Sequence, residues 1–273
     1  MEKKELREIT REELDMILKN HKLWLDTDGK EGERADLSYT DLRYVDLGCA
    51  NLYHANLYRA NLEGVNLYHA NLRLANLRDT NLKGADLSSA KLRCADLTHA
   101  NLADADLRYA NLMVADLTGA DLEGVNLLGA DLGGANLRGA NLEGANLWLA
   151  NLYDTDLTDV KNFPDIPMEC PTEGSFIGWK RAGGYIIKLE IPEDAKRSSG
   201  TGIKCRCNKA KVLSIETLGG TSVDATEVHS DYDPTFIYKI GETVTVENFD
   251  NNRFNECAPG IHFYMDRDRA VRY

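Results

Sequence analysis

A leucine occupies every fifth position between Leu37 and Leu157 without interruption. The residue two positions before each leucine is small or β-branched, usually alanine, and the residue directly before it is Asp or Asn, with Lys91 as the single exception. A period of five matches neither the 3.6-residue helical period nor the two-residue strand period. The pattern therefore predicts a repeat architecture in which each unit of five contributes one short extended segment and a turn.

Four such units would close a square coil of about 20 residues, and coils stacked at the strand spacing of about 4.8 Å would form a rod. The units RADLS, CANLY, HANLY and RANLE resemble the pentapeptide repeat family, whose unit is written A(D/N)LXX. The resemblance covers residues 35–159 and implies an all-β solenoid, a right-handed quadrilateral β-helix. It implies no particular activity.

A cap is expected before the repeats, because the open end of a solenoid exposes its core. Thr10 and Glu13 form a capping box, and the apolar residues that follow recur on one helical face. We therefore predict an amphipathic helix over residues 11–24 that covers the first coil, within an N-terminal segment 1–34.

The five-residue period ends after Leu157, and we predict a proline-containing linker over residues 160–174. Residues 175–273 contain β-branched and aromatic runs, a polar loop PEDAKRSSGTG and a short helical tail, which predicts a separate small β-rich or α+β domain. This part is similar to an uncharacterised domain that follows pentapeptide repeats in bacterial and phage proteins. That resemblance implies no chemistry.

The net charge of −12 belongs mostly to the repeats. Residues 35–159 hold seventeen acidic and nine basic side chains, a net charge of −8. Binding to nucleic acid needs a dense stripe of Lys and Arg, so nucleic acid is not expected as a partner. An acidic rod suggests instead that the protein itself resembles DNA, because some pentapeptide repeat proteins mimic DNA and inhibit DNA gyrase. This chain departs from them, since its repeats contain no inserted loop.

The sequence favours a cytoplasmic protein that does not enter a membrane. Its charged start, MEKKELREIT, does not resemble a signal peptide, and no apolar run is long enough to span a bilayer. The six cysteines are irregularly spaced, unlike a disulfide framework.

Two surface patches of the solenoid are candidates for binding. An apolar patch is expected near the end of the repeats, and we predict that the second domain docks on it; a dimer contact or a foreign partner is the alternative. This docking patch consists of Leu128, Trp148, Leu149 and Tyr153. An aromatic cluster nearer the start suits either partner recognition or exposed β structure. It consists of Tyr39, Tyr44, Tyr53, Tyr58, Tyr68, His54 and His69.

The C-terminal part contains the residues that could carry chemistry. Cys205, Cys207, Cys257 and His262 are four possible zinc ligands, although buried structural cysteine is the commoner outcome for such residues. Cys257 with His262 as base could also act as a nucleophile.

A basic and glycine-containing segment follows the polar loop and offers an anion site. Arg197, Lys204 and Arg206 could bind a phosphate or carboxylate, with a solvated flexible loop as the alternative.

Taken together, these patterns predict a noncatalytic scaffold or protein-interaction module without a cofactor, whose partner is a protein. A monomer is the simpler expectation. The alternative classes are an enzyme or metal-binding module that uses Cys257 and His262, and a DNA-mimicking inhibitor of gyrase.

Overall fold

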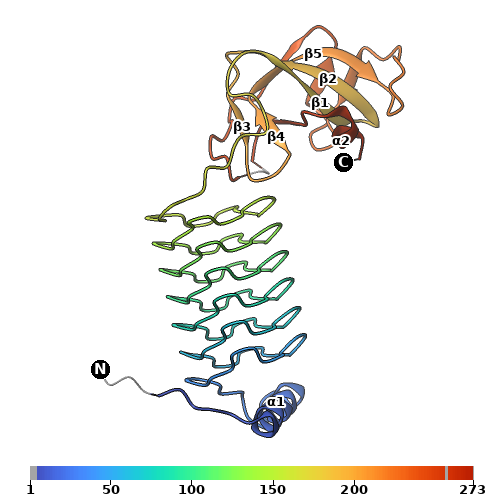
Figure 1. The fold of residues 1–273 in the computed structure, drawn as a ribbon. Helices are drawn as coiled ribbons and strands as arrows, with labels where there is room; N and C mark the ends of the chain where they lie inside the picture. The colour runs from blue at the N-terminus through green and yellow to red at the C-terminus, as the bar shows by residue number, and fades with distance from the viewer. Residues whose placement is uncertain (1–4, 256–257, 273) are drawn as a thin grey trace. The chain divides into compact units, whose positions relative to one another are not determined.

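A computed structural model describes residues 5–255 and 258–272 of the chain. The chain divides into two compact units, Met1–Asp165 and Ile166–Tyr273. The first unit contains one helix and a stack of coils, and the second contains nine strands and a short helix within its described residues (Figure 1).

The coils of the first unit repeat every twenty residues, as predicted. Parallel backbone bridges join each residue before a leucine to the residue twenty positions later, from Asp36↔Asn56 to Asn141↔Lys161. Four units of five therefore close one coil, and the coils stack as a quadrilateral β-helix (Figure 1). The stack contains no inserted loop.

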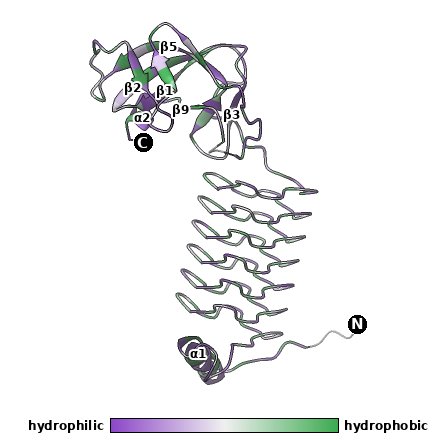
Figure 2. Cartoon of the chain, turned by 180° about the vertical axis from the view of Figure 1, so that it is seen from behind, coloured by the Kyte–Doolittle hydropathy of each residue, from purple (hydrophilic) through white to green (hydrophobic). Residues whose placement is uncertain are grey.

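The leucines fill the interior of the solenoid. Every one from Leu37 to Leu152 is between 0 and 3 % exposed, whereas Leu157 in the last unit is half-buried. The small residues beside them are mostly buried, including Thr40 and Thr80, whose hydroxyl groups donate to backbone carbonyls. Hydrophobic and hydrophilic segments alternate along the coils in Figure 2. The period of five thus places one leucine on the interior of each side.

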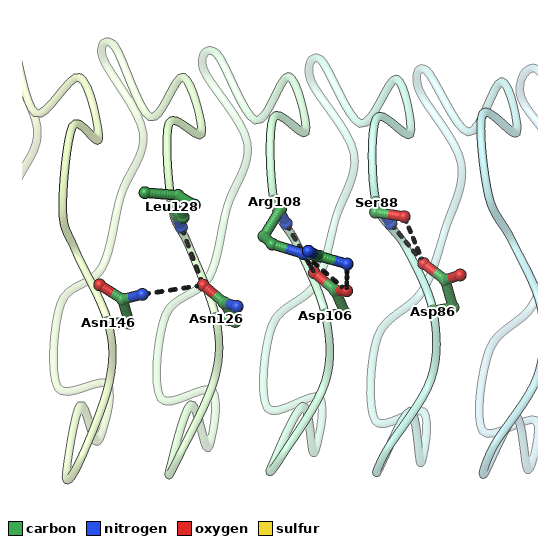
Figure 3. Close-up of polar contacts among 7 residues, drawn as sticks. All are labelled: Asp86, Ser88, Asp106, Arg108, Asn126, Leu128 and Asn146. Carbon is green, nitrogen blue, oxygen red and sulfur yellow. Dashed lines mark hydrogen bonds and ion pairs between the residues drawn. The ribbon is translucent and has the colours of Figure 1, made fainter.

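The Asp and Asn residues before the leucines connect neighbouring coils. In each one described here the side-chain oxygen accepts the backbone N–H two residues later, as Asn126 does from Leu128 (3.2 Å) in Figure 3. An Asn in the next coil can also donate its amide to that oxygen, as Asn146 does to Asn126 (3.1 Å). Carboxylates only accept hydrogen bonds, so no such bond joins Asp86 to Asp106. We call these side-chain hydrogen bonds between successive coils the Asx ladder. The ladder therefore continues only where the residue at this position in the next coil is Asn.

The turns between the sides place their second central residue at positive φ. Glycines occupy this position in several later repeats, as the sequence predicts, with φ of 65–67° at Gly119, Gly129 and Gly139. Earlier coils use other residues there, including Tyr39, His54 and others at φ between 50 and 65°. The stacked backbone thus imposes the left-handed conformation on residues that do not favour it.

The predicted N-terminal helix is α1, Arg11–Asp26, and its capping box is formed by Thr10 and Glu13. The buried face of α1 carries Leu14 and His21, and His21 accepts the backbone N–H of Ala35 through Nδ1 (3.1 Å). The helix is mostly hydrophilic on the rest of its surface (Figure 2). These contacts show that α1 lies over the first coil. The segment before the helix also pairs with the first coil, through Arg7↔Thr40.

The second unit is built from three antiparallel sheets with the orders β1-β2-β5-β8, β3-β4-β9 and β6-β7. Its core contains apolar residues from all three sheets, including Leu189, Cys207, Val228 and Phe263. The strands and helix are β1 Phe176–Ala182, β2 Tyr185–Ile191, β3 Arg197–Ser199, β4 Cys205–Cys207, β5 Lys209–Glu216, β6 Glu227–His229, β7 Ile237–Lys239, β8 Thr243–Thr245, β9 Ile261–Phe263 and α2 Arg267–Arg272.

Three glycines explain how β1 fits its neighbours. Gly183 and Gly184 take φ of +56° and +78° and close a two-residue hairpin between β1 and β2. A Cβ added to Gly178 would lie 2.5 Å from Cδ2 of Phe263, so only glycine leaves room for that ring.

Two sequence expectations for this region need correction. Residues 166–174 belong to the second unit rather than to a linker, and Cys170 lies in its core at 2 % exposure. The polar segment PEDAKRSSGTG is not simply a loop, because it contains strand β3 with Ser198 and Ser199 buried. The hydroxyl group of Ser199 accepts the backbone N–H of Glu169 (2.8 Å), so a hydrogen bond compensates for the burial of this polar side chain.

Candidate functional site

One side of the solenoid carries basic and apolar residues but no carboxylate over four coils. We call this side, made of residues 50–54, 70–74, 90–94 and 110–114, the basic face. Arg73, Lys91 and Arg93 are exposed on it. Arg73 and Arg93 occupy the same position in consecutive coils, and the N–H of Leu74 donates to the carbonyl of Arg93 (3.2 Å). The basic face is therefore a local exception on an acidic rod.

The cations of the basic face differ from most others in the solenoid by having no ion-pair partner among the described residues. Only two other solenoid cations share this property, Arg78 and Lys83, and they lie on other faces. The paired ones are Arg43 with Asp41, Arg59 with Asp79, Arg108 with Asp106, and Arg138 with Asp159.

Apolar side chains lie between the cations of the basic face. Leu74 and Val114 are 42 % and 53 % exposed, and Cys94 and Met113 are half-buried. A small hollow of about 210 Å³ adjoins Leu74 and is also lined by Arg34 and His54. This combination suits a partner that carries both negative charge and apolar side chains.

The predicted docking patch is exposed within the first unit. Trp148, Leu149 and Tyr153 are 38, 45 and 52 % exposed, and Leu128 is half-buried. Docking of the second unit on this patch stays a prediction.

Several rings of the aromatic cluster near the start of the solenoid pack against one another. The rings of Tyr39 and Tyr58 meet edge to face at 5.4 Å, and those of Tyr68 and His69 at 4.2 Å. The Arg59 guanidinium lies 5.2 Å from the centre of the Tyr58 ring. Tyr39, Tyr58, Tyr68 and His69 thus pack in pairs, while Tyr44 is 73 % exposed, and partner recognition by this cluster stays a prediction.

The predicted anion loop is not formed as the sequence suggested. The Arg197 guanidinium donates to main-chain carbonyls, among them those of Gly174 (2.7 Å) and Glu193 (2.6 Å). Arg206 is 2 % exposed and donates to the carbonyl of Asn252 (2.8 Å). Both arginines therefore stabilise loops inside the domain. Of the three predicted contacts, only Lys204 lines a cleft.

His262 does not lie on the same face as the other described candidate zinc ligands of this region, Cys205 and Cys207. In the register of β4 and β9, Arg206 lies opposite His262, whereas the two cysteines lie opposite Phe263 and Ile261. Opposite residues of an antiparallel pair project from the same face, so His262 and the cysteines project from different faces. Among residues 5–255 and 258–272 no group of three potential metal ligands comes together.

Cys205 and Cys207 behave as structural thiols. Burial raises the pKa of the Cys207 thiol to about 12, and the neighbouring Cys170 thiol together with burial raises the pKa of Cys205. Neither thiol is therefore activated as a thiolate. Cys257 lies outside the described residues, so its pairing with His262 as nucleophile or metal ligand stays a prediction.

A cleft of about 640 Å³ in the second unit brings together residues that the sequence did not connect. One end contains Lys180 from β1, Lys204 from the segment before β4, and His262 from β9, and a smaller hollow of about 370 Å³ shares these three residues. The other end is lined by Phe236 and Tyr238, whose rings meet at 5.2 Å. The cleft therefore has a basic end and an aromatic end.

The charges at the basic end are set by burial and by mutual repulsion. Burial, and secondarily the positive charge of Lys204, lower the pKa of Lys180 to about 8. Burial, followed by Lys204 and Lys180, lowers the pKa of His262 to about 3, so its imidazole is neutral near pH 7. His262 Nε2 lies 3.2 Å from the carbonyl oxygen of Ala258 and donates its proton there. His262 thus adds no charge to the two lysines.

Lys180 gave no signal in the sequence, because it lies in an ordinary strand segment, WKRA.

Among the described residues, neither helix is long and apolar enough to cross a bilayer.

Comparisons with known proteins agree with this two-part organisation. Residues 35–159 match the pentapeptide repeats, in overlapping segments, and residues 166–270 match a family of unknown function, DUF5758. An uncharacterised protein, L223 of Acanthamoeba polyphaga mimivirus, is 38 % identical over 96 residues, which cover 32 % of this chain and 61 % of the viral protein. The match thus spans less than two thirds of that relative.

Two solved structures are similar to part of the chain. A pentapeptide repeat protein from the thylakoid lumen of Arabidopsis thaliana is 34 % identical, with 34 % of this chain and 65 % of that chain covered and a TM-score of 0.34. HetL, a pentapeptide repeat protein involved in heterocyst differentiation regulation in Nostoc sp. strain PCC 7120, is 37 % identical, with 47 % and 70 % covered and a TM-score of 0.24. The chain is a pentapeptide repeat protein with an N-terminal helix and a C-terminal DUF5758 domain.

Proposed function

We propose that this protein is a noncatalytic protein-interaction scaffold whose solenoid binds an acidic, partly apolar segment of a partner protein. The observation that supports this most is the basic face, where Arg73, Lys91 and Arg93 have no ion-pair partner in the described part of the solenoid. Repeated hydrogen bonds between coils hold these side chains on a rigid support, so little order has to be gained on binding.

A protein segment fits this face better than nucleic acid does. Leu74 and Val114 are exposed between the cations. Apolar side chains of a partner protein could pack against them and exclude water, whereas phosphate groups could not. The net charge of −8 on the solenoid would also repel an extended polyanion that reached beyond the basic face.

Fluorescence anisotropy with the full chain tests this proposal. The probe is a labelled 20-residue peptide that combines Glu with Leu and Phe, compared with polyglutamate of equal charge and with single-stranded DNA of 20 nucleotides. The mixed peptide should bind most tightly. The double variant R73E/R93E should weaken that binding at least about tenfold, because two attractive charges become repulsive.

The matched control is R78E/K83E, which makes the same change in net charge on other faces of the solenoid. It should leave the affinity within about twofold, because long-range effects are screened by salt. Equal losses in the two double variants, or tighter binding of DNA than of the peptide, would contradict the proposal.

We also propose that the protein works in the cytoplasm, which is supported by the five unpaired cysteines among the described residues.

The catalytic and gyrase-inhibiting alternatives stay predictions. A supercoiling assay tests the latter. A measured activity or bound metal that is lost in Cys257→Ser would support the former.

A further inference from the structure

We infer that Lys180 is a reactive amine that forms a reversible imine with an aromatic aldehyde bound in the cleft of the C-terminal domain. The ring of the aldehyde would lie against Tyr232 and Phe236, which line the larger part of this cleft. This site is independent of the basic face, because every residue that lines it belongs to the second unit.

The Lys180 side chain lies in partly apolar surroundings. It extends from β1, is half-buried, and lines both the cleft of about 640 Å³ and the smaller hollow of about 370 Å³. Its Nζ lies 5.7 Å from the centre of the Tyr238 ring, which is packed in the core at 2 % exposure. Among residues 5–255 and 258–272, Lys180 makes no hydrogen bond and no ion pair. The amine is therefore partly removed from water and can be reached through the cleft.

Burial favours the unprotonated form of this amine. It is the main cause that lowers the pKa of Lys180 to about 8, and the charge of Lys204 is the second. Lys204 has an interaction of its own, so burial is the cause that matters here. Asp231 and, more weakly, Cys207 act in the opposite direction, and the pKa of about 8 includes their effect. About a tenth of the amine is then unprotonated at pH 7, compared with less than about 0.1 % of an ordinary lysine.

The other titratable groups around the amine do not hold it as an ammonium ion. Asp231 accepts the backbone N–H of Gly183 (2.8 Å), and neither it nor another described carboxylate forms an ion pair with Lys180. Burial keeps the imidazole of His262 neutral near pH 7 and raises the pKa of the Tyr238 hydroxyl, so both side chains are uncharged. An uncharged product at Lys180 therefore leaves no ion pair of the described residues broken.

The expected reaction is a condensation. The lone pair of the unprotonated Nζ attacks the aldehyde carbon and forms a C–N bond, while the carbonyl π electrons move to the oxygen, which takes up the proton that the nitrogen releases. The carbinolamine then loses water and leaves a C=N bond. One amine and one aldehyde thus give one imine and one water without a change of oxidation state. Because a neutral imine replaces a partly buried ammonium ion, the apolar surroundings favour the product.

The residues opposite the amine suit an aromatic substituent. Tyr232 and Phe236 belong to the segment between β6 and β7, and both line the larger cleft. Tyr232 is 86 % exposed and also borders the smaller hollow, whereas Phe236 is half-buried. An aryl ring bound here would cover the exposed Tyr232 ring. The volume of the cleft is in the range of small-molecule sites, about 300–1,000 Å³.

Trapping of the imine in the full chain tests the inference. The protein is equilibrated with benzaldehyde at pH 7, imines are reduced with sodium borohydride, and the modified lysines are identified by peptide mass spectrometry. Lys180 should be modified at least about tenfold more than Lys188, which lies against Trp179 and does not line the cleft. Modification of Lys180 should also level off above about pH 8. Equal modification of the two lysines would overturn the inference.

A second experiment locates the ring of the aldehyde. Tyr232→Ala removes an exposed ring and should lower the ratio of modified Lys180 to modified Lys188 at least about threefold for benzaldehyde. With acetaldehyde, which has no ring, the ratio should change less than about twofold. The matched control is Tyr44→Ala, which removes another exposed tyrosine, 73 % exposed, from the first unit and should leave both ratios unchanged. Equal ratios for benzaldehyde in Tyr232→Ala and in the wild type would refute an aromatic aldehyde as the ligand.

Discussion

The solenoid and the C-terminal domain bury their residues by different rules. In the solenoid, the leucines are buried in the interior of the coils, and from Leu37 to Leu142 each leucine N–H donates to a carbonyl in the next coil. In the C-terminal domain, Phe263 packs against Gly178, which lies on a strand far away in the sequence. The surroundings of a residue in the first unit follow from its place in the five-residue repeat. The surroundings of a residue in the second unit depend on the particular residues that pack against it.

The largest expected effect tests the repeat rule in the interior. Leu92→Ala removes a side chain that is 0 % exposed and should lower the free energy of unfolding by about 2–5 kcal/mol. Leu157→Ala changes the half-buried last leucine and should cost less than about 1 kcal/mol. Urea unfolding followed by circular dichroism measures both. Equal losses would show that the end of the solenoid is as tightly packed as its middle.

The second prediction concerns pH and the C-terminal domain. The pKa of His262 is about 3 when folded and about 6.5 when unfolded, so between these values only the unfolded chain binds the proton. The free energy of unfolding should therefore fall as the pH falls from about 6.5 to 3. The loss should be on the order of 2 kcal/mol, after allowance for the partial exposure of the imidazole.

Urea midpoints measured between pH 7 and 3 report this loss, with His262→Gln as the comparison. The glutamine does not titrate, so the variant should show a shallower dependence on pH. Identical pH profiles for the two proteins would rule out His262 as the source.

The third prediction compares glycines of the two units. Gly178→Ala should cost about 1–3 kcal/mol, because the new Cβ would lie 2.5 Å from the Phe263 ring. Gly84→Ala meets no atom within 4 Å but must adopt φ near +63°, which should cost about 1 kcal/mol. Thermal unfolding of the two variants measures the difference. A larger loss for Gly84→Ala would reverse the comparison.

The smallest effect should be a gain in stability. Asp86→Asn supplies an amide that can donate to Asn66 one coil earlier and keeps the oxygen that accepts the N–H of Ser88. One added hydrogen bond should raise the free energy of unfolding by about 0.5–1 kcal/mol. Asp106→Asn gains the same amide but loses the ion pair with Arg108, so it should be near neutral. A destabilised Asp86→Asn would show that the ladder does not contribute as we describe.

The solenoid could be predicted closely from the sequence because its signal is periodic. The buried leucines, the twenty-residue coil and the cap with Thr10 and Glu13 follow from spacing alone. The donation of Asn amides from coil to coil was not anticipated, although the preference for Asp or Asn at one position was its visible trace. Glycine favours positive φ, yet Tyr39 and His54 show that the fold imposes it on other residues as well.

The candidate sites were harder to predict because they depend on which side chains face each other. Cys205 and Cys207 share a face because they alternate on strand β4, but the register of β9 that separates them from His262 has no local signal. Arg197 and Arg206 appeared to be free charges because their carbonyl partners lie on loops distant in sequence. Lys180 lines the cleft only because two sheets and several loops converge there.

Because a coil of the solenoid has twenty residues and four sides, each unit of five residues advances the chain by a quarter turn. Deleting one unit of five between Arg73 and Arg93 would move every later side chain to the adjacent face, and Arg93 would no longer stand above Arg73. Deleting twenty residues after the basic face would shorten the solenoid by one layer of about 4.8 Å and leave that face intact. Changes in repeat number by multiples of four units therefore vary the reach of the protein without altering what its basic face presents.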